Sequence, residues 1–568
     1  MGFIFLKTEL VRYSKKRSFW LWMSFLALIL AIFLINGLHE QYPDEFDNIL
    51  GGWYLLHGKL IYKDWFTHHG PVSYLVSALV NLFSGRSFVN FRLVYSVFLF
   101  FLTLLPIYFI RRRLEGVNTS FFAYFILILG LSLTYFWGHM LLADNIAAFF
   151  LVPVTALVFL KVVNNKRFDT KEYSFISIFC FLALFSALTY AFLVAGIYLF
   201  LIVYYFISEK GHLKFLNLIK IISILLVPYL FFVIYLLLTG SLSSYYYDAI
   251  KFNRDYYIYY PGLEGKPPAN PVRYAIVIAQ GFHNNFSSML NTVKSFNFDF
   301  PFNISLAVSN TALGIYLLLK RKYLAFLFVL GILIFANART NPFSSRETDY
   351  QSAVYIMISL FITAYIIPRL YKELNSNIEY SKKIILSLVF VITIIYAFYN
   401  FTFILRKFSY KAYDKYMGFA AIIYDRPKIA PFINQIEDKN STAWIGPFYY
   451  EDLYYMNAKL PSKYQVFLPG MGQSPKISKE FLIDFQNNKP EIVYFNKDFY
   501  ILGASPKEYG QFFLDYLDSD YITLSDFDPT LKYKLTLDPS LEFDKKLFIN
   551  KDRADRVVNK MKEQGWIE

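Results

Sequence analysis

The sequence predicts a polytopic α-helical membrane protein with a C-terminal extracytoplasmic α/β domain, and three observations lead to this prediction. Hydrophobic residues make up 56% of the 568 residues and charged residues only 17%, whereas about 25% of residues are charged in an average soluble protein. The mean hydropathy is +0.37. Several separate apolar runs reach about 20 residues, which is the length that a helix needs to cross a bilayer.

The charges of the loops orient about eleven predicted membrane helices. Short loops rich in Lys and Arg alternate with loops that carry most of the acidic candidates, and Lys and Arg gather on the cytoplasmic side of membrane proteins. We therefore expect the N-terminus in the cytoplasm and everything after Lys407 outside. The first span is expected to stay uncleaved, because it is long and no small-residue cleavage site follows it. The predicted spans are 19–38, 88–110, 121–137, a fourth ending at 160, two within 173–207, 215–238, 302–319, a ninth ending near 335, a tenth ending at 367, and 384–404.

Two domains are expected. The transmembrane domain is 1–408, with a first outer loop at 39–87 and a long outer loop at 240–301; within the first loop, the apolar spacing of 48–60 is typical of a helix lying in the membrane interface. After residue 409 charged residues become frequent, and short strand patterns such as EIVYF alternate with helix patterns. This change predicts a soluble extracytoplasmic α/β domain at 409–568.

Charge and cysteine content exclude several classes of partner and of site. The net charge is +14, but the basic residues lie mostly in short loops beside apolar spans, so we assign them to topology and expect no nucleic-acid partner. The single cysteine, Cys180, excludes an internal disulfide and a cysteine-based metal site. The sequence contains no glycine-rich phosphate loop in the C-terminal part.

The first outer loop gathers ionisable and aromatic residues directly after a membrane span: QYPDEFDNILGGWYLLHGKLIYKDWFTHHGPVSY, residues 41–74. Ionisable residues at a membrane boundary are functional candidates. We take Asp44 and Glu45 as the catalytic candidates, because a carboxylate held near the lipid headgroups can act as a general base or bind a hard divalent cation. The plain alternative is the solvated end of a helix.

Asp144 is a second acidic candidate. It lies in a turn too short to be a free loop, between two predicted spans. The alternative is a helix N-cap, which the adjacent Asn145 favours. Both roles are compatible, because a cap at the outer surface can also point into a cleft.

His68 and His69 precede the turn Gly70-Pro71. Adjacent histidines point in different directions, and the further ligands of a zinc site are absent at familiar spacing. We expect one of them to bind a phosphate or sugar hydroxyl and the other to be structural, with Asp64 as a group able to orient either one. His139 is a weaker candidate of the same kind.

Three basic residues of the outer loops, Lys266, Arg339 and Arg346, complete the substrate-binding candidates. Each alone is compatible with ordinary surface charge. As a group they suit a reaction with a phosphate leaving group, which needs cations on that face. Arg346 is the first choice, since it directly precedes a predicted span.

These residues resemble the C-type glycosyltransferase superfamily. The similarity lies in an acidic pair after the first span, the pattern G-x-x-L-x-x-G-x-x-x-Y-x-D, and a later G-P. In this sequence the residues are Asp44-Glu45, Gly52, Leu55, Gly58, Tyr62, Asp64 and Gly70-Pro71. The bacterial branch related to protein O-mannosyltransferases and to the aminoarabinose transferases of lipid A is the most similar. Gly70-Pro71 departs from the double proline of that family.

The resemblance implies the chemistry. The donor is a polyprenyl-phosphate-linked sugar, the acceptor a surface glycan, lipid or protein, and transfer takes place on the outer face with inversion at the anomeric carbon. Asp44 is then the base or metal-coordinating residue with Glu45 assisting, and Asp144 matches the acid of the second loop. A divalent cation, Mg²⁺ or Mn²⁺, is a candidate cofactor, with Asp44 and Asp144 as its candidate ligands. The compartment implied is the bacterial inner membrane, with the C-terminal domain periplasmic or extracellular.

Two other functions remain open at this stage. A flippase or other transporter of lipid-linked oligosaccharides handles the same class of lipid, but transporters place charges or broken helices near mid-membrane. Here the candidate charges lie at the outer ends of spans, which favours an enzyme. An O-antigen ligase or polymerase is the third candidate, and for it we would expect the key arginines in a large outer loop.

Overall fold

The computed structural model describes residues 17–39, 41–114, 117–208, 214–257, 271–294, 301–338, 350–377, 379–417, 427–437, 439–501, 503–531 and 541–568. The chain forms two compact units. The first comprises Met1–Glu40, Phe83–Pro228 and Ala275–Ile422, and the second comprises Gln41–Leu82, Tyr229–Tyr274 and Ile423–Glu568. The units therefore differ from a division at residue 408, because two segments before that residue pack with the C-terminal part.

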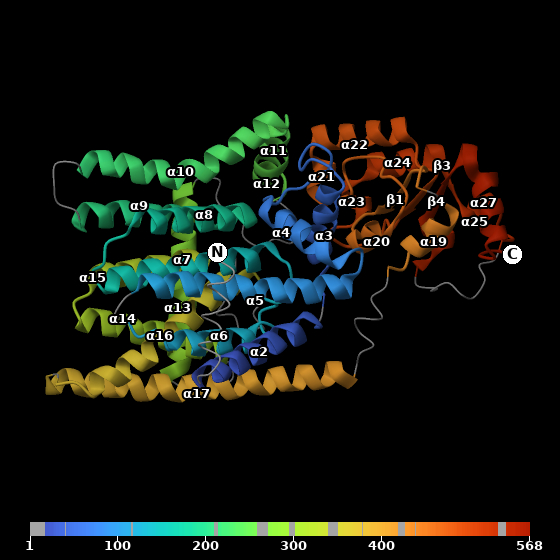
Figure 1. Cartoon of the computed structure of the whole chain (residues 1–568). Coiled ribbons are helices and arrows are strands. Elements are labelled where there is room, and N and C mark those ends of the chain that lie inside the picture. Colours follow the sequence, from blue (N-terminus) through green and yellow to red (C-terminus); the bar gives the residue numbers. More distant parts are fainter. Residues whose placement is uncertain are drawn as a thin grey trace, which may run out of the picture. The chain divides into compact units, whose positions relative to one another are not determined.

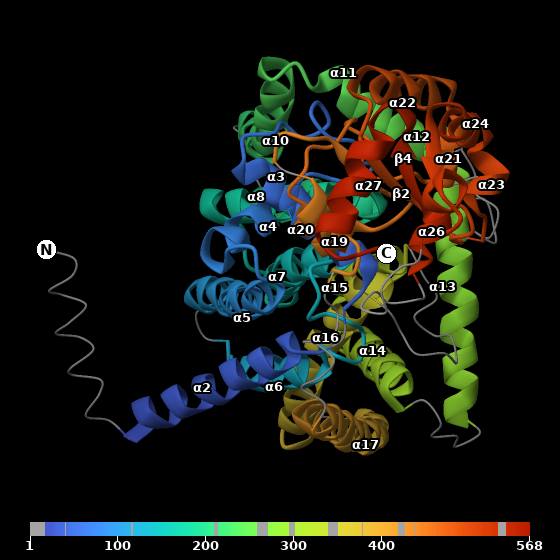
Figure 2. The same cartoon turned by 90° about the vertical axis from the view of Figure 1, so that its right-hand side faces the viewer.

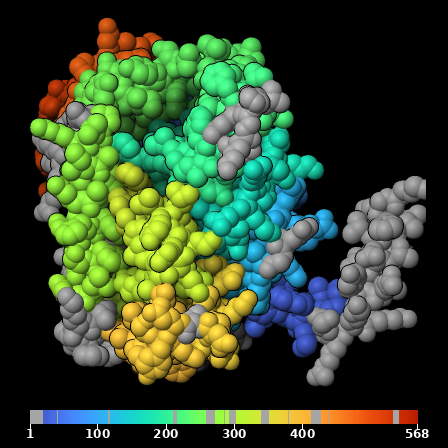
Figure 3. Space-filling view, turned by 90° about the vertical axis from the view of Figure 1, so that its left-hand side faces the viewer, coloured from blue at the N-terminus to red at the C-terminus, as the bar shows by residue number. Residues whose placement is uncertain are grey.

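The first unit is a bundle of helices that run side by side (Figure 1). Figure 3 shows the side-chain surface of one face of the molecule, in a view turned by 90° from that of Figure 1. The helices are α2 (Arg17–Gly37), α5 (Phe88–Arg113), α6 (Phe121–Ser132), α7 (Ala143–Val163), α8 (Thr170–Ser186), η1 (Leu188–Tyr190), α9 (Ala191–Ser208), most of α10 (Lys214–Leu238), most of α13 (Pro271–Lys294), α14 (Pro301–Leu319), α15 (Tyr323–Ala336), η4 (Tyr350–Ser352), α16 (Ala353–Leu374) and α17 (Tyr380–Met417).

Eight helical stretches in the described part of the chain are long and apolar enough to cross a membrane. This agrees with the expected polytopic membrane protein, but the count is lower than the eleven that we predicted. The difference arises because three predicted spans form shorter helices: α6, α8 and α15 have 12, 17 and 14 residues. In the bundle α7 is wholly covered by other helices, whereas most of the apolar surface of α2 and α10 is exposed, as expected for helices that face lipid.

The bundle buries one ion pair between consecutive helices. Lys161 at the end of α7 lies 2.6 Å from Glu172 at the start of α8, and both side chains are buried. Asp169 and Glu172 also form a reciprocal cap at the start of α8, with the Glu172 carboxylate accepting from the Asp169 backbone N–H. The charge of each partner is therefore compensated by a full opposite charge and by further hydrogen bonds.

The second unit contains a four-stranded sheet in the C-terminal part of the chain (Figure 2). The strand order is β1-β2-β4-β3; β1 and β2 are parallel, and β4 is antiparallel to both of its neighbours. The strands are β1 (Ala443–Gly446), β2 (Ile492–Phe495), β3 (Tyr521–Thr523) and β4 (Leu547–Asn550). The helices around them are α19 (Ala430–Ile436), α20 (Tyr450–Tyr455), α21 (Pro469–Gln473), α22 (Pro475–Asn488), α23 (Pro506–Tyr509), α24 (Gln511–Asp520), α25 (Leu524–Phe527), α26 (Phe543–Lys546), η6 (Lys551–Arg553) and α27 (Ala554–Glu563).

An aromatic core holds this α/β fold together. Trp444 of β1 is fully buried and contacts rings from α22 and α24, with Phe481 and Phe513 each 5.6 Å from it between ring centroids. This part of the chain combines strands and helices, and its role as a soluble extracytoplasmic domain stays a prediction.

Two helices of the first loop also belong to the second unit: α3 (Pro43–Leu56) and α4 (Val72–Ser84). They pack closely because α3 has no side chain at Gly51 and Gly52, where a Cβ atom would collide with Tyr74 and Ser77 of α4. The apolar residues Ile49 and Leu50 of α3 are buried in protein. Trp53 and Leu56 of the same face are half-buried, so protein covers only part of it, and the interfacial position of this helix stays a prediction.

The neighbouring helix α4 buries polar residues and exposes apolar ones, which is the reverse of a helix on the surface of a soluble protein. Its polar residues Ser73, Ser77 and Asn81 are buried, and Asn81 donates to the Ile49 carbonyl at 3.2 Å. Its exposed residues include Leu75, Leu79 and Leu82, which share one face. This arrangement suits a helix with an apolar environment outside and polar partners inside.

A third segment of the second unit follows the end of α10. It comprises α11 (Leu242–Tyr245), the π-helical turn η2 (Tyr246–Lys251) and α12 (Phe252–Asp255). π-Helical turns are rare and occur often at functional sites. This segment contacts the first loop through Asn253, whose amide donates to the His68 carbonyl at 2.7 Å.

Candidate functional site

The acidic pair of the first loop opens α3. Asp44 and Glu45 occupy its first turn after Pro43, where carboxylates are favoured by the helix dipole. The two differ in access: Asp44 is partly exposed, whereas Glu45 is fully buried. Of the two predicted catalytic residues, Asp44 is thus the one that a substrate reaches without rearrangement of the loop.

The third carboxylate of the loop, Asp47, is the one that sequence reasoning left out of the site. It is one helical turn after Asp44 and only 4% exposed. The Tyr74 hydroxyl donates to Asp47 Oδ2 at 2.8 Å, and the Thr67 hydroxyl lies 2.6 Å from the Tyr74 hydroxyl. Asp47 follows Asp44 by three residues, and residues i and i+3 share one face of a helix. This spacing was the signal in the sequence that could have added Asp47 to the site.

Burial is the main cause that raises the pKa of Asp47 from 3.8 to about 7. The hydrogen bond from Tyr74 opposes the increase, and the nearby negative charge of Asp44 adds to it. A carboxyl group with a pKa near neutrality can gain and lose a proton under physiological conditions, which is typical of groups at functional sites.

The two histidines lie in different environments. The His68 ring is 7% exposed and packs against rings from α12 and the residues after it, with 6.1 Å between its centroid and that of Phe252 and 4.5 Å to that of Tyr257. The His69 side chain is 33% exposed, and its Nε2 atom lies 3.9 Å from Asp47 Oδ2. His69 is therefore the accessible histidine, and His68 fills an aromatic core.

Asp64 makes a local contact. Its carboxylate accepts from the Leu60 backbone N–H at 2.6 Å and closes the loop between α3 and α4. The acid nearest to a histidine ring is Asp47 rather than Asp64. Asp47 lies next to the His69 ring because α4 packs on α3. The spacing of the residues in the loop does not reveal this contact.

The C-terminal part contributes two side chains to the surroundings of Asp47. Tyr450 of α20 and Gln465 of the following loop both lie within hydrogen-bonding reach of its carboxyl group. Gln465 is fully buried, and among the described residues neither polar atom of its amide makes a hydrogen bond of good geometry. Sequence reasoning did not find either residue, because they are distant in the chain and belong to no recognisable motif.

Asp144 belongs to the first unit. It lies in the first turn of α7 and is fully buried, and the N-cap position is Leu142, so Asp144 is not the predicted cap. Asn145 secures the turn by donating to the carbonyls of Trp137 and Met140 at 2.7 and 3.0 Å. His139 of this turn is buried beside His39, with 6.2 Å between the ring centroids.

The three basic candidates Lys266, Arg339 and Arg346 lie outside the described residues. Among the residues that are described, no group of three or more His, Cys, Asp or Glu side chains gathers in a way that could hold a metal ion. Asp44 and Asp144 belong to different compact units. The divalent cation stays a prediction, and we route no chemical step through it.

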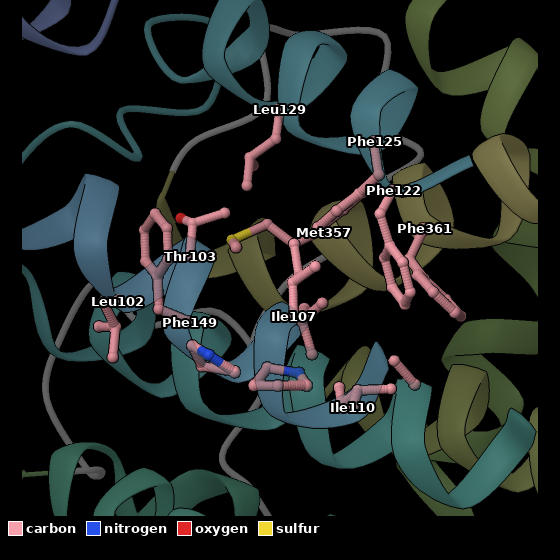
Figure 4. Close-up of a pocket in the computed structure, with 14 residues that line it drawn as sticks. Leu102, Thr103, Ile107, Ile110, Phe122, Phe125, Leu129, Phe149, Met357 and Phe361 are labelled. Carbon is pink, nitrogen blue, oxygen red and sulfur yellow. The ribbon is translucent and has the colours of Figure 1, made fainter. Parts of the chain in front are cut away.

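The first unit contains an apolar pocket, shown in Figure 4. Side chains of α5, α6, α7 and α16 line it, among them Ile107, Phe125, Phe149 and Met357. Thr103 supplies a hydroxyl, and no ionisable side chain lines the pocket. Its lining offers no acid–base chemistry.

Comparison with known proteins gave no relative. No protein-family model matches the sequence, and neither curated protein sequences nor solved structures gave a significant match.

Proposed function

We propose that the protein is a membrane glycosyltransferase that transfers a hexosyl or pentosyl group from a polyprenyl-phosphate donor to a glycan, lipid or protein acceptor. One observation carries the proposal. In the loop after the first membrane helix, the partly exposed carboxylate of Asp44 precedes the buried Asp47, whose neighbour His69 is 33% exposed. A base and a group that can carry positive charge are what displacement of a phosphate from a sugar requires.

The proposed reaction is a direct displacement. Asp44 takes the proton of the acceptor hydroxyl, and the acceptor oxygen forms a bond to the anomeric carbon. The bond between that carbon and the phosphate oxygen breaks, its electron pair leaves with the polyprenyl phosphate, and the configuration inverts. His69 stabilises the negative charge of the departing phosphate.

A lipid-linked donor fits the rest of the molecule. The loop follows α2 directly, which is apolar enough to cross a bilayer, and a lipid donor reaches such a loop by lateral diffusion. The leucine face of α4 is an apolar surface next to the polar residues that face α3. No nucleotide-binding fold is required for such a donor. By the sequence resemblance, the loop lies on the outer face of a bacterial inner membrane.

The test is sugar transfer by the purified full-length protein in lipid nanodiscs. A panel of polyprenyl-phosphate sugars is supplied with a glycan and lipid extract as acceptor, and release of polyprenyl phosphate is measured for wild type and Asp44→Asn. We expect release by wild type and a loss of about 100-fold or more in the variant, with donor binding retained. Asp515→Asn removes a surface carboxylate of α24 and is the matched control, expected to keep wild-type activity.

Two results would overturn the proposal. Full activity of Asp44→Asn would move the chemistry away from the first loop. If wild type consumed no donor with any acceptor but carried lipid-linked sugar across a bilayer, the protein would be a transporter.

A further inference from the structure

Four residues of the first loop form a closed chain of contacts, which we call the Asp47 network: Asp47, Thr67, His69 and Tyr74. Three hydrogen bonds connect them. The His69 backbone N–H donates to Thr67 Oγ1 at 3.1 Å, the hydroxyls of Thr67 and Tyr74 are 2.6 Å apart, and Tyr74 donates to Asp47 at 2.8 Å. The His69 ring then returns to Asp47, with Nε2 3.9 Å from Oδ2.

The number of hydroxyl protons determines which group donates in each hydrogen bond of the network. Tyr74 has one hydroxyl proton, and Asp47 accepts it. The contact between Thr67 and Tyr74 is therefore made with the proton of Thr67, whose oxygen accepts from the His69 N–H. Every donor points toward Asp47, so the network favours an ionised carboxylate there, whereas burial opposes it.

His69 connects this buried carboxylate with the outside. Its side chain is 33% exposed, whereas that of Asp47 is 5% exposed. The other groups that face the pair are Asp44, Tyr74, Tyr450 and Gln465 around Asp47. On the opposite side the His68 ring is tilted by 39° against that of His69, with ring centroids 3.9 Å apart, and Tyr257 packs against His68. Among the described residues no Lys or Arg forms an ion pair with Asp47, whereas the His69 imidazole lies 3.9 Å from it.

We propose that Asp47 is the positioning residue of His69: its buried carboxylate fixes the imidazole and retains a proton on it, so that His69 presents a positive charge to a phosphate-bearing ligand. This inference rests on the proposed function for the nature of the ligand. It adds that the charges of the two groups are coupled, because an ionised Asp47 strengthens proton binding by His69. The resulting activity depends on pH in a range where a lysine at this position would stay charged.

The first test follows the histidine directly and needs no activity. Isotope-labelled histidine in the full-length protein in nanodiscs is titrated by NMR, and the His69 signal is assigned with His69→Gln. We expect Asp47→Asn to weaken proton binding by His69 about tenfold or more, which is one pKa unit. Asp64→Asn, the exposed acid of the same loop, should leave the titration unchanged. Equal titration of His69 in wild type and Asp47→Asn would overturn the proposal.

Tyr74→Phe is the second variant, in case Asp47→Asn does not fold. It removes the hydroxyl that stabilises the ionised Asp47 and should also weaken proton binding by His69. If Tyr74→Phe and wild type titrate identically, Asp47 does not act through this network.

The pH profile of sugar transfer is the third readout. Transfer by wild type should fall as pH rises and His69 loses its proton; the fall should move to lower pH in Asp47→Asn and to higher pH in His69→Lys. Identical profiles in the three proteins would contradict the proposal. If wild type transfers no sugar, the proposed function fails, but the NMR titration still decides the role of Asp47.

Discussion

Glu172 of the first unit and Asp47 of the second are both buried carboxyl groups, yet their surroundings differ in kind. Glu172 lies 2.6 Å from the buried ammonium group of Lys161. Asp47 has neutral hydroxyl donors and, at 3.9 Å, the imidazole of His69, which is charged only when protonated. A fully compensated charge is structural, whereas a carboxyl group with incomplete compensation responds to protons and ligands. The comparison shows that the two carboxyl groups differ in their partners rather than in their burial.

The largest effect is expected from breaking the compensated pair. Glu172→Gln leaves the buried Lys161 without its counter-charge and should destabilise the protein by about 3–5 kcal/mol. The double variant Lys161→Met/Glu172→Met removes both charges and should recover most of this loss. Chemical unfolding in mixed micelles measures both variants. Equal stability of Glu172→Gln and wild type would show that the pair is not the structural element that we describe.

The contribution of Asp47 to the stability of the protein should instead depend on pH. The folded pKa of Asp47, about 7, lies above its unfolded value of 3.8, so its contribution to stability is fully present below the unfolded pKa and is lost as pH rises through 7. This difference corresponds to about 4 kcal/mol. Asp47→Asn should therefore gain stability relative to wild type by about that amount between pH 4 and pH 8. Parallel unfolding curves of the two proteins over this range would contradict the assignment.

Removing one donor to Asp47 should have a smaller effect that also depends on pH. Tyr74→Phe deletes a hydrogen bond to a group that is ionised at pH 8, where we expect a loss of about 2 kcal/mol. At pH 5 Asp47 is protonated and the loss should be smaller. Unfolding at the two pH values tests this, and a larger loss at pH 5 would refute the direction of the hydrogen bond.

The smallest effect is expected at the exposed acid of the same loop. Asp64→Ala removes the acceptor of the Leu60 N–H, an exposed hydrogen bond, and should cost about 1 kcal/mol with little change between pH 5 and pH 8. Thermal unfolding in nanodiscs measures this variant. A pH-dependent loss as large as that of Tyr74→Phe would show that exposure does not separate the two acids.

Part of this arrangement could be predicted from the sequence. Hydropathy predicted the membrane helices. The span of α6 was predicted too long, because the apolar run continues past Ser132, where the helix ends, into a turn.

Other features depend on packing between segments that are distant in the chain. The sequence offered Asp64 as the partner of the histidines, but close approach of α4 to Gly51 and Gly52 places Asp47 next to His69. The apolar face of 48–60 was assigned to lipid, and protein covers Ile49 and Leu50 of it. Tyr450 and Gln465 lie far along the chain, and no local pattern associates them with Asp47.

The central claim is that Asp47 holds an exchangeable proton near neutral pH. Infrared difference spectroscopy of wild type against Asp47→Asn, titrated in lipid nanodiscs, tests this most directly. We predict the band of a protonated carboxyl group that is present at pH 5, absent at pH 9 and half lost near pH 7. A carboxylate that is ionised throughout this range in wild type would contradict the account.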